Sequence, residues 1–190
     1  MKELPKLKLS GREEWEEWLE ANHSSSQGVW LELAKKGTDR VGLSRTDALE
    51  VALCYGWIDG QAASIDAFSW MQRFTPRTRR SRWSRINREA VTQLIESGLM
   101  KPAGMAQVEE AKRDGRWDDA YDSPRTMTVP DDLRAKLESH PAGLALFDEL
   151  DSGDRYAILY HVHDAKRPET RARRIDKYVN LILEGKPIRR

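Results

Sequence analysis

The sequence predicts an α+β fold in which a small antiparallel sheet with helices in the N-terminal part is followed by a C-terminal helical unit. Residues 12–113 alternate between segments with helical spacing of apolar residues and segments rich in strand formers. Residues 130–185 show helical signals. Between them, residues 117–129 have no useful hydrophobic period and contain the turn signal Asp122-Ser-Pro. We therefore predict four parts, in chain order: an α+β domain at 1–116, a connecting loop at 117–129, a helical domain at 130–186 and a basic tail at 187–190.

The first helix is predicted from a capping box. In this motif Ser10 accepts a hydrogen bond from a helical amide, and the Glu13 carboxylate accepts one from the amide of Ser10. Within residues 12–21, Trp15 and Trp18 share one face of the helix, so we expect both indoles in the core.

The predicted sheet begins with the strand Val29-Trp-Leu-Glu-Leu, which is rich in strand formers. Ser44 then caps a second helix that runs through Tyr55. Residues 57–75 change from helical spacing to strand patterns on both sides of a turn at Asp66. An antiparallel hairpin is the economical interpretation of this segment.

Three aromatic residues of the hairpin are predicted to share one face of a strand. Phe68, Trp70 and Phe74 have the even spacing that places side chains on one face of a strand. We expect Trp57 and Trp70 to be substantially buried, with Ile65 and Phe68 among their partners across the hairpin.

Further helices are predicted from their first and last residues. Asn87 is a good N-cap for a helix that runs to Ser97, and another helix spans about 102–113. In the C-terminal part, a proline in the first turn or a serine cap marks helix openings at Pro130, Pro141, Ser152 and Pro168.

Composition excludes several classes of protein. Cys54 is the only cysteine, so the chain cannot build an intramolecular disulfide, a thiolate zinc site or an iron–sulfur cluster, and we expect a cytoplasmic protein. No 18 apolar residues run together, so we expect no membrane insertion. The sequence has neither a glycine-rich phosphate loop nor a dinucleotide fingerprint, and we predict no cofactor.

Catalytic and metal sites lack support in the sequence. His161 and His163 stand two positions apart and would point about 200° from one another on a helix, so they cannot share a metal ion there. Ser81 and Ser84 have no histidine close to them in the sequence, and Cys54 is expected on an inward helix face. We therefore predict no catalytic residue and no metal site, which favours a protein that is not an enzyme.

Residues 73–88 are the sharpest feature of the chain, because they hold seven arginines and no acidic residue. Planar guanidinium groups bind phosphate or carboxylate through paired hydrogen bonds, and the interleaved Phe74 and Trp83 can stack on a base or sugar. One interpretation is a site for an anionic ligand or nucleic acid. The other is a solvated surface, or a set of partners for acidic side chains. The candidate arginines in this segment are Arg73, Arg77, Arg79 and Arg82.

A second candidate site surrounds Asp59, which lies between Gly56 and Gly60. The two glycines let a strand begin sharply and let another group approach closely. In one interpretation, Asp59 orients a ligand or acts as a general base beside Trp57, and Gln61 adds an amide. In the other, which we favour, Asp59 is a turn or capping acid for the arginine-rich segment.

The last predicted helix carries a second basic segment, in which Arg171 and Arg174 lie close to one stripe. If the two basic segments form one face, their arginines surround an anion-binding groove whose walls are Phe74 and Trp83. We favour the alternative, in which the arginines pair with the acidic stretch 109–154.

Several motifs in the chain carry a family resemblance. They are Ala52-Leu-Cys-Tyr-Gly-Trp-Ile-Asp-Gly-Gln, Arg73-Phe-Thr-Pro-Arg, Ser81-Arg-Trp-Ser-Arg-Ile-Asn and Ala165-Lys-Arg-Pro-Glu-Thr-Arg-Ala-Arg-Arg-Ile. Over about residues 11–186 the sequence resembles the YdeI/OmpD-associated family, also labelled bacteriocin-protection proteins. The resemblance implies a link to bacterial envelope stress, without giving a reaction or a set of catalytic residues.

The sequence therefore favours a cytoplasmic, non-enzymatic binding or stress-protection protein. Its expected partner is a protein or a small anionic ligand. The first alternative is a nucleic-acid-binding protein that uses the arginine-rich segments. The second is an enzyme that acts on a small anionic metabolite through Asp59 and the arginines.

Overall fold

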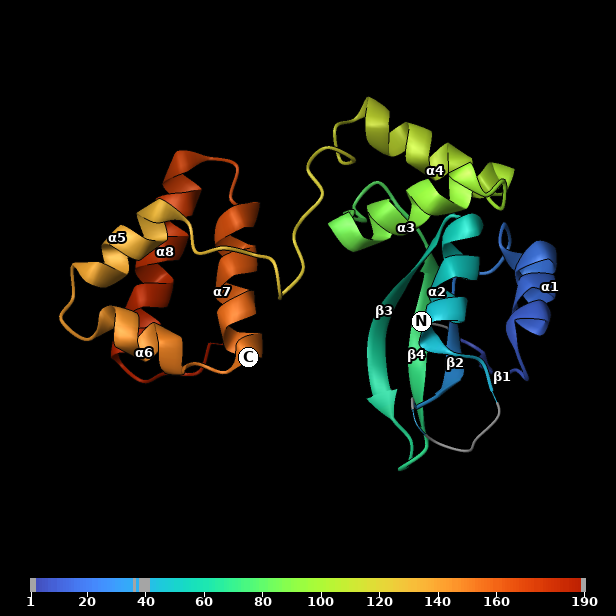
Figure 1. The fold of residues 1–190 in the computed structure, drawn as a ribbon, viewed down its shortest axis with the longest axis horizontal. Helices are drawn as coiled ribbons and strands as arrows, with labels where there is room; N and C mark the ends of the chain where they lie inside the picture. The colour runs from blue at the N-terminus through green and yellow to red at the C-terminus, as the bar shows by residue number, and fades with distance from the viewer. Residues whose placement is uncertain (1–2, 36, 38–41, 189–190) are drawn as a thin grey trace. The chain divides into compact units, whose positions relative to one another are not determined.

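The chain forms two compact units, Met1–Ala120 and Tyr121–Arg190 (Figure 1). The computed structural model describes residues 3–35, 37 and 42–188, so the last two residues of the predicted basic tail lie outside the described residues. We call the first unit the α+β unit and the second the helical unit, and we describe each by itself.

The α+β unit combines a sheet with helices, and in its described residues the strand order is β1-β2-β4-β3. β1 pairs with β2 in parallel, whereas β4 pairs with β2 and with β3 in the antiparallel sense. α2 packs on β3 and also contacts the helices α1, α3 and α4. The elements are β1 (Lys6–Lys8), α1 (Arg12–Asn22), β2 (Val29–Ala34), α2 (Arg45–Cys54), β3 (Trp57–Ser64), β4 (Ser69–Pro76), α3 (Arg85–Glu96) and α4 (Pro102–Arg113).

The predicted α+β class is confirmed, but the sheet is mixed rather than antiparallel. The difference comes from β1, which the sequence analysis did not identify. This strand has only the residues Lys6, Leu7 and Lys8, too few to show a period, and it forms by pairing with Trp30, Leu31 and Glu32 of β2.

The N-cap of the first helix lies one residue later than predicted. Gly11 occupies the N-cap position, and no side chain caps the helix. Glu14, rather than Glu13, reaches back to accept a hydrogen bond from the amide of Ser10 at 2.8 Å. The predicted core face is confirmed by Trp15, which is fully buried, whereas Trp18 is partly buried and stacks on it with ring centroids 5.4 Å apart.

The predicted hairpin is confirmed, and Asp66 holds its turn by accepting hydrogen bonds from the amides of Phe68 and Ser69. Trp57 is 1% exposed, as predicted, whereas Trp70 is only partly buried. The expectation that Ile65 and Phe68 are strand partners of these tryptophans is wrong. Both lie in the turn rather than in a strand, and Phe68 is 56% exposed.

The helix after the hairpin, in contrast, starts earlier than predicted. Ser84 is its N-cap, and its hydroxyl accepts a hydrogen bond from the amide of Asn87 at 3.1 Å. Asn87, the predicted cap, is buried inside the first turn of α3. Serine and asparagine both cap helices well, so local propensity does not choose between them.

The helical unit packs its helices around a separate core. Leu133, Phe147, Ile158 and Val179 are among its buried residues. No helix in the described part of the chain is both long enough and apolar enough to cross a membrane. The helices are α5 (Asp131–Glu138), α6 (Gly143–Glu149), α7 (Ser152–Asp164) and α8 (Pro168–Leu183).

Candidate functional site

The candidate site is the loop of residues 77–84 between β4 and α3, which we call the arginine loop. Its first residue is tied to the end of α2, because the amide of Arg77 donates to the carbonyl of Gly56 at 2.9 Å. The guanidinium of Arg77 lies 3.6 Å from the centroid of the Trp83 ring and donates to the carbonyl of Arg82 at 3.2 Å. Arg77 is 5% exposed and Trp83 is 2% exposed. The stack therefore joins the loop to the hydrophobic core of the α+β unit, to which Trp83 belongs.

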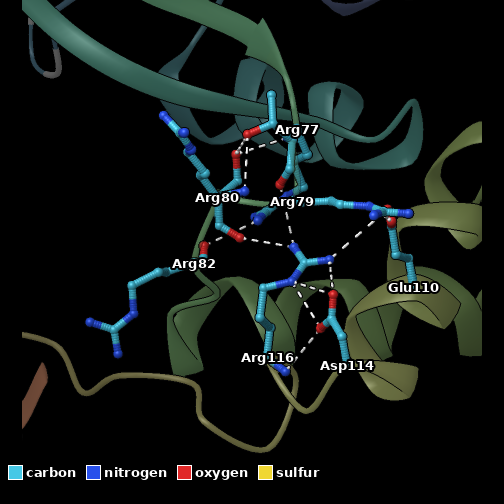
Figure 2. Close-up of polar contacts among 9 residues, drawn as sticks. Arg77, Arg79, Arg80, Arg82, Glu110, Asp114 and Arg116 are labelled. Carbon is cyan, nitrogen blue, oxygen red and sulfur yellow. Dashed lines mark hydrogen bonds and ion pairs between the residues drawn. The ribbon is translucent and has the colours of Figure 1, made fainter. Parts of the chain in front are cut away.

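A second arginine, from beyond α4, braces the loop backbone (Figure 2). Arg116 donates from Nη1 to the carbonyl of Ser81 at 3.1 Å and to that of Thr78 at 3.4 Å. Its Nε lies 2.9 Å from both carboxylate oxygens of Asp114. These hydrogen bonds hold the pKa of the Asp114 carboxyl below its usual range. Sequence analysis missed Arg116, because it lies 35 residues from Ser81 in the chain and belongs to no arginine cluster.

The outer side of the loop carries arginines on both flanks. In Figure 2 the side chains of Arg80 and Arg82 extend to one side, and that of Arg79 extends to the other, toward Glu110. The Arg79 side chain is 85% exposed, and its Nε is 3.0 Å from a carboxylate oxygen of Glu110. Among the described residues, the Arg80 guanidinium has no hydrogen bond and no ion pair. The loop is thus fixed from within and positively charged outside.

The remaining arginines of the segment 73–88 have other surroundings. Arg73 lies within β4, opposite Trp30 of β2. Arg88 lies in α3, where its Nη1 donates to the carbonyl of Trp117 at 3.1 Å. The segment therefore divides between structural arginines and exposed ones.

The residues around Asp59 lie in β3. The indole nitrogen of Trp57 donates to the carbonyl of His23 at 3.2 Å, and its ring packs in the core, which corrects the expectation that it lines a ligand site. Asp59 pairs with Arg45 of α2 at 3.1 Å rather than with an arginine of residues 73–88. Gln61 is exposed beside the bulge that follows Asp59.

The predicted aromatic walls of an anion-binding groove are not exposed. Phe74 is completely buried, with its ring centroid 5.7 Å from that of Trp15, and Trp83 is covered by Arg77 and Trp117. Even spacing predicts which side chains share a strand face with Phe74, but it does not predict whether that face is exposed. In the structure it is the core side of the sheet. Neither ring can therefore stack on a base or sugar.

In the helical unit, the two candidate arginines are held by acids of the same unit. Arg171 pairs with Asp132 and also donates to the carbonyl of Val162 at 2.8 Å. Its guanidinium holds the pKa of the Asp132 carboxyl below its usual range. Arg174 lies 3.3 Å from Asp164. Glu110 and Asp132 belong to the acidic stretch 109–154 that we expected to pair with arginines, whereas Asp164 lies outside it.

The histidines of α7 contact different partners. His161 shares a hydrogen bond with the hydroxyl of Tyr178, whereas Nε2 of His163 lies 3.1 Å from the carbonyl of Thr128. In residues 3–35, 37 and 42–188, no three His, Cys, Asp or Glu side chains are grouped so that they could hold a metal ion. Cys54 is buried in α2, and burial raises the pKa of its thiol, which disfavours the nucleophilic thiolate.

Fold and site together define a two-part chain, in which an α+β unit with a braced arginine loop is followed by a unit built of helices. Residues 7–107, just over half of the chain, match a family model described as "Domain of unknown function (DUF8412)". Residues 126–185 match the family described as "Bacteriocin-protection, YdeI or OmpD-Associated". The chain therefore belongs to the DUF8412 family through its α+β unit, and its helical unit is similar to the YdeI/OmpD-associated family.

The predicted YdeI/OmpD-associated family is thus confirmed, but its extent is smaller than the predicted 11–186. Motifs in the middle of the chain, including Arg73-Phe-Thr-Pro-Arg, lie in the range of the other family model. The chain is also similar to a Bacillus subtilis (strain 168) protein named "Uncharacterized protein YdeI", with 33% identity over 63 residues. This match spans 33% of the chain and 32% of the relative. No solved structure matches the chain.

Proposed function

We propose that the protein is a non-enzymatic binding protein of the cytoplasm, with a role in stress protection, and that its arginine loop contacts an anionic group of a partner. One observation carries this proposal. The loop backbone is held from within by Arg77 and Arg116, while the side chains of Arg79 and Arg80 remain exposed on its outside.

A braced loop is suited to binding because its backbone is already ordered before the partner arrives. Association then loses less conformational entropy than it would with a mobile loop. Guanidinium groups on such a loop can meet carboxylate or phosphate oxygens through paired hydrogen bonds, which lysines cannot do. Arg80 is the most available of these groups, because its guanidinium has no partner among the described residues.

The same geometry favours an acidic protein segment or a small anion over nucleic acid. Binding to single-stranded nucleic acid usually combines positive charge with exposed aromatic rings on which bases stack. The aromatic side chains of the segment, Phe74 and Trp83, are buried, so the loop offers charge without a stacking surface. Nucleic-acid binding is therefore the alternative function.

The enzyme hypothesis has less support. It requires Asp59 and the arginines to act on one ligand, whereas the carboxylate of Asp59 pairs with Arg45 on α2. The description of the matched family supports a protective role, since it includes bacteriocin protection. Turnover of a metabolite by the purified protein at more than about 1 per second would overturn the non-enzymatic proposal.

The binding proposal is tested by fluorescence anisotropy with a labelled ten-residue polyglutamate peptide and, separately, a labelled oligothymidine. The variant R79Q/R80Q removes two positive charges from the loop. The matched control K6Q/K8Q removes two exposed charges from β1, at the opposite edge of the sheet from β3. We expect the peptide to bind at low salt, with affinity reduced about fivefold or more in R79Q/R80Q and less than about twofold in the control.

Two results would overturn the proposal. If neither probe binds at low salt, or if both double variants lose affinity equally, the loop is not a specific anion site. If oligothymidine binds more tightly than the peptide and its affinity depends on Arg79 and Arg80, the nucleic-acid alternative replaces the proposed function. Its binding constant would then fall steeply with salt, because each phosphate contact releases counterions.

A further inference from the structure

The helical unit contains a cavity of about 620 Å³. Small-molecule sites commonly have volumes of about 300–1,000 Å³, so the size is suited to a ligand. One part of its lining is apolar and comes from Ala157 of α7, Leu181 of α8, and Pro187 and Ile188 beyond α8. These side chains can bury the hydrocarbon part of a ligand.

The rest of the lining is polar and comes from His161 of α7, from Lys177 and Tyr178 of α8, and from Lys186 beyond α8. His161 and Tyr178 both line the cavity and share a hydrogen bond between Nδ1 and the phenol hydroxyl. Their rings are nearly parallel, with centroids 5.8 Å apart. Lys177 also lines the cavity, and its ammonium lies 5.4 Å from the centroid of the Tyr178 ring. Polar groups of two helices therefore converge at one part of the cavity.

Of the two lysines that line the cavity, one has no counter-ion among the described residues. Lys186 lies 2.7 Å from Glu184, and Arg174 lies 3.3 Å from Asp164. Lys177, in contrast, has no ion pair with any residue of the described ranges. A ligand with one negative charge would therefore complete the pairing in this part of the helical unit.

The lowered pKa of His161 favours a neutral imidazole in the polar part of the cavity. Partial burial and the positive charges of Arg174 and Lys177 lower the pKa of His161, against the opposing effect of Asp164. A neutral imidazole that accepts the Tyr178 hydroxyl hydrogen at Nδ1 carries its own hydrogen on Nε2. The histidine then offers a hydrogen-bond donor to the ligand without a second full charge.

We propose that this cavity binds an aliphatic monocarboxylate, such as a medium-chain fatty acid. Its hydrocarbon chain lies against Ala157, Leu181 and Ile188, and its carboxylate lies at Lys177 and His161. The site belongs to the helical unit alone and is independent of the arginine loop.

The test is isothermal titration calorimetry of the full chain with decanoate, below the concentration at which decanoate forms micelles. Decanol serves as the uncharged probe of the same length. The variants K177Q and R173Q each remove one charge from α8, but only Lys177 lines the cavity. We expect saturable binding of decanoate, weakened about fivefold or more in K177Q and less than about twofold in R173Q, with decanol binding at least about fivefold more weakly.

A second pair of variants tests the cavity itself. Ala157→Leu places extra volume in the cavity, whereas Ala172→Leu adds the same volume at an exposed position of α8. We expect only Ala157→Leu to abolish binding, while its helical circular dichroism stays that of the parent protein. R79Q/R80Q should bind decanoate normally, which separates this site from the proposed function.

Three results would overturn the proposal. The first is the absence of saturable decanoate binding by the parent protein. The second is an equal loss of affinity in K177Q and R173Q, which would indicate general electrostatic attraction. The third is equal binding of decanol, or unchanged binding in folded Ala157→Leu, either of which would place the ligand outside a carboxylate-binding cavity.

Discussion

The guanidinium of Arg77 lies 3.6 Å from the centroid of the Trp83 ring, and both side chains are almost completely buried. Two residues of one short loop therefore form their own packed pair between β4 and α3. A planar cation stacked on an indole is a strong form of the cation–π interaction when water is excluded. Part of the positive charge of the arginine-rich segment thus stabilises the fold, which leaves the exposed arginines for the proposed binding.

The first prediction concerns this pair. In Arg77→Lys the ammonium cannot stack as a plane, and it cannot reproduce the geometry of the bond to the Arg82 carbonyl. We expect the free energy of unfolding of the α+β unit to fall by about 2 kcal/mol. Urea unfolding followed by tryptophan fluorescence measures it, because all seven tryptophans lie at or before Trp117 and report on this unit.

The matched control is Arg79→Lys, in the same loop but with an exposed side chain. It should change the free energy of unfolding by less than about 0.5 kcal/mol. Equal effects of the two substitutions would show that the stack of Arg77 on Trp83 contributes no stability of its own.

The second prediction compares two tryptophans of the hairpin. Trp57 is 1% exposed, contacts the rings of Trp15 and Trp18 edge-on, and donates its indole hydrogen to a backbone carbonyl. Trp57→Ala should lower the free energy of unfolding by about 3–5 kcal/mol. Trp70 is only partly buried, so Trp70→Ala should cost about 1–2 kcal/mol. A larger loss for Trp70→Ala than for Trp57→Ala in urea titrations would contradict the observed burial.

The third prediction concerns the contact between α2 and α4. A Cβ atom built on Gly104 would lie 2.2 Å from the carbonyl oxygen of Cys54 and 2.8 Å from that of Leu53. Gly104→Ala should therefore lower the free energy of unfolding by about 1–3 kcal/mol, although alanine usually stabilises a helix relative to glycine. Gly42→Ala is the control, because among the described residues its Cβ would meet only the Cβ of Ala34, at an ordinary contact distance of 3.7 Å. An increase in thermal midpoint for Gly104→Ala would show that the two helices can separate at no cost.

Hydrophobic spacing predicted most of the α+β unit, because long amphipathic segments determine their own buried face. The core face of α1, with Trp15 and Trp18, and the hairpin around Asp66 followed from such patterns. The pattern failed where an element depends on its neighbour. β1 is a strand only through its pairing with β2, and Phe68 has the spacing of a strand face but lies in the turn.

For the candidate site, the sequence identified the arginine-rich segment but not the arrangement of its side chains. A run of arginines indicates anion binding, yet their roles depend on groups that are far away in the chain. The ion pair between Arg79 and Glu110 depends on the packing of α4 in the folded unit. The hydrogen bonds from Arg116 to the loop carbonyls depend on the same packing. The burial of Trp83 under Arg77 could not be predicted from the sequence either, because neither spacing nor composition shows that a cation and an indole stack.

The last prediction concerns the pH dependence of the helical unit. His161 has a pKa below its ordinary value of 6.5, because partial burial and the charge of Arg174 disfavour its protonated form. As the pH falls through 6.5, the unfolded chain takes up a proton before the folded one does. The helical unit should therefore lose stability from pH 6.5 down to the folded pKa of His161, and no further loss should come from this group below it.

Two measurements check this expectation. The His161 ring signal, followed by NMR against pH, should titrate below 6.5 in the folded protein. Hydrogen exchange of the α7 and α8 amides should show less protection at pH 5.5 than at pH 7.5, after correction for the intrinsic exchange rate. The loss should be smaller in His161→Gln and should persist in His163→Gln, which changes a histidine of the same helix that lacks the contact with Tyr178. A His161 pKa at or above 6.5 would contradict the prediction, because the folded unit would then gain stability from the proton instead of losing it.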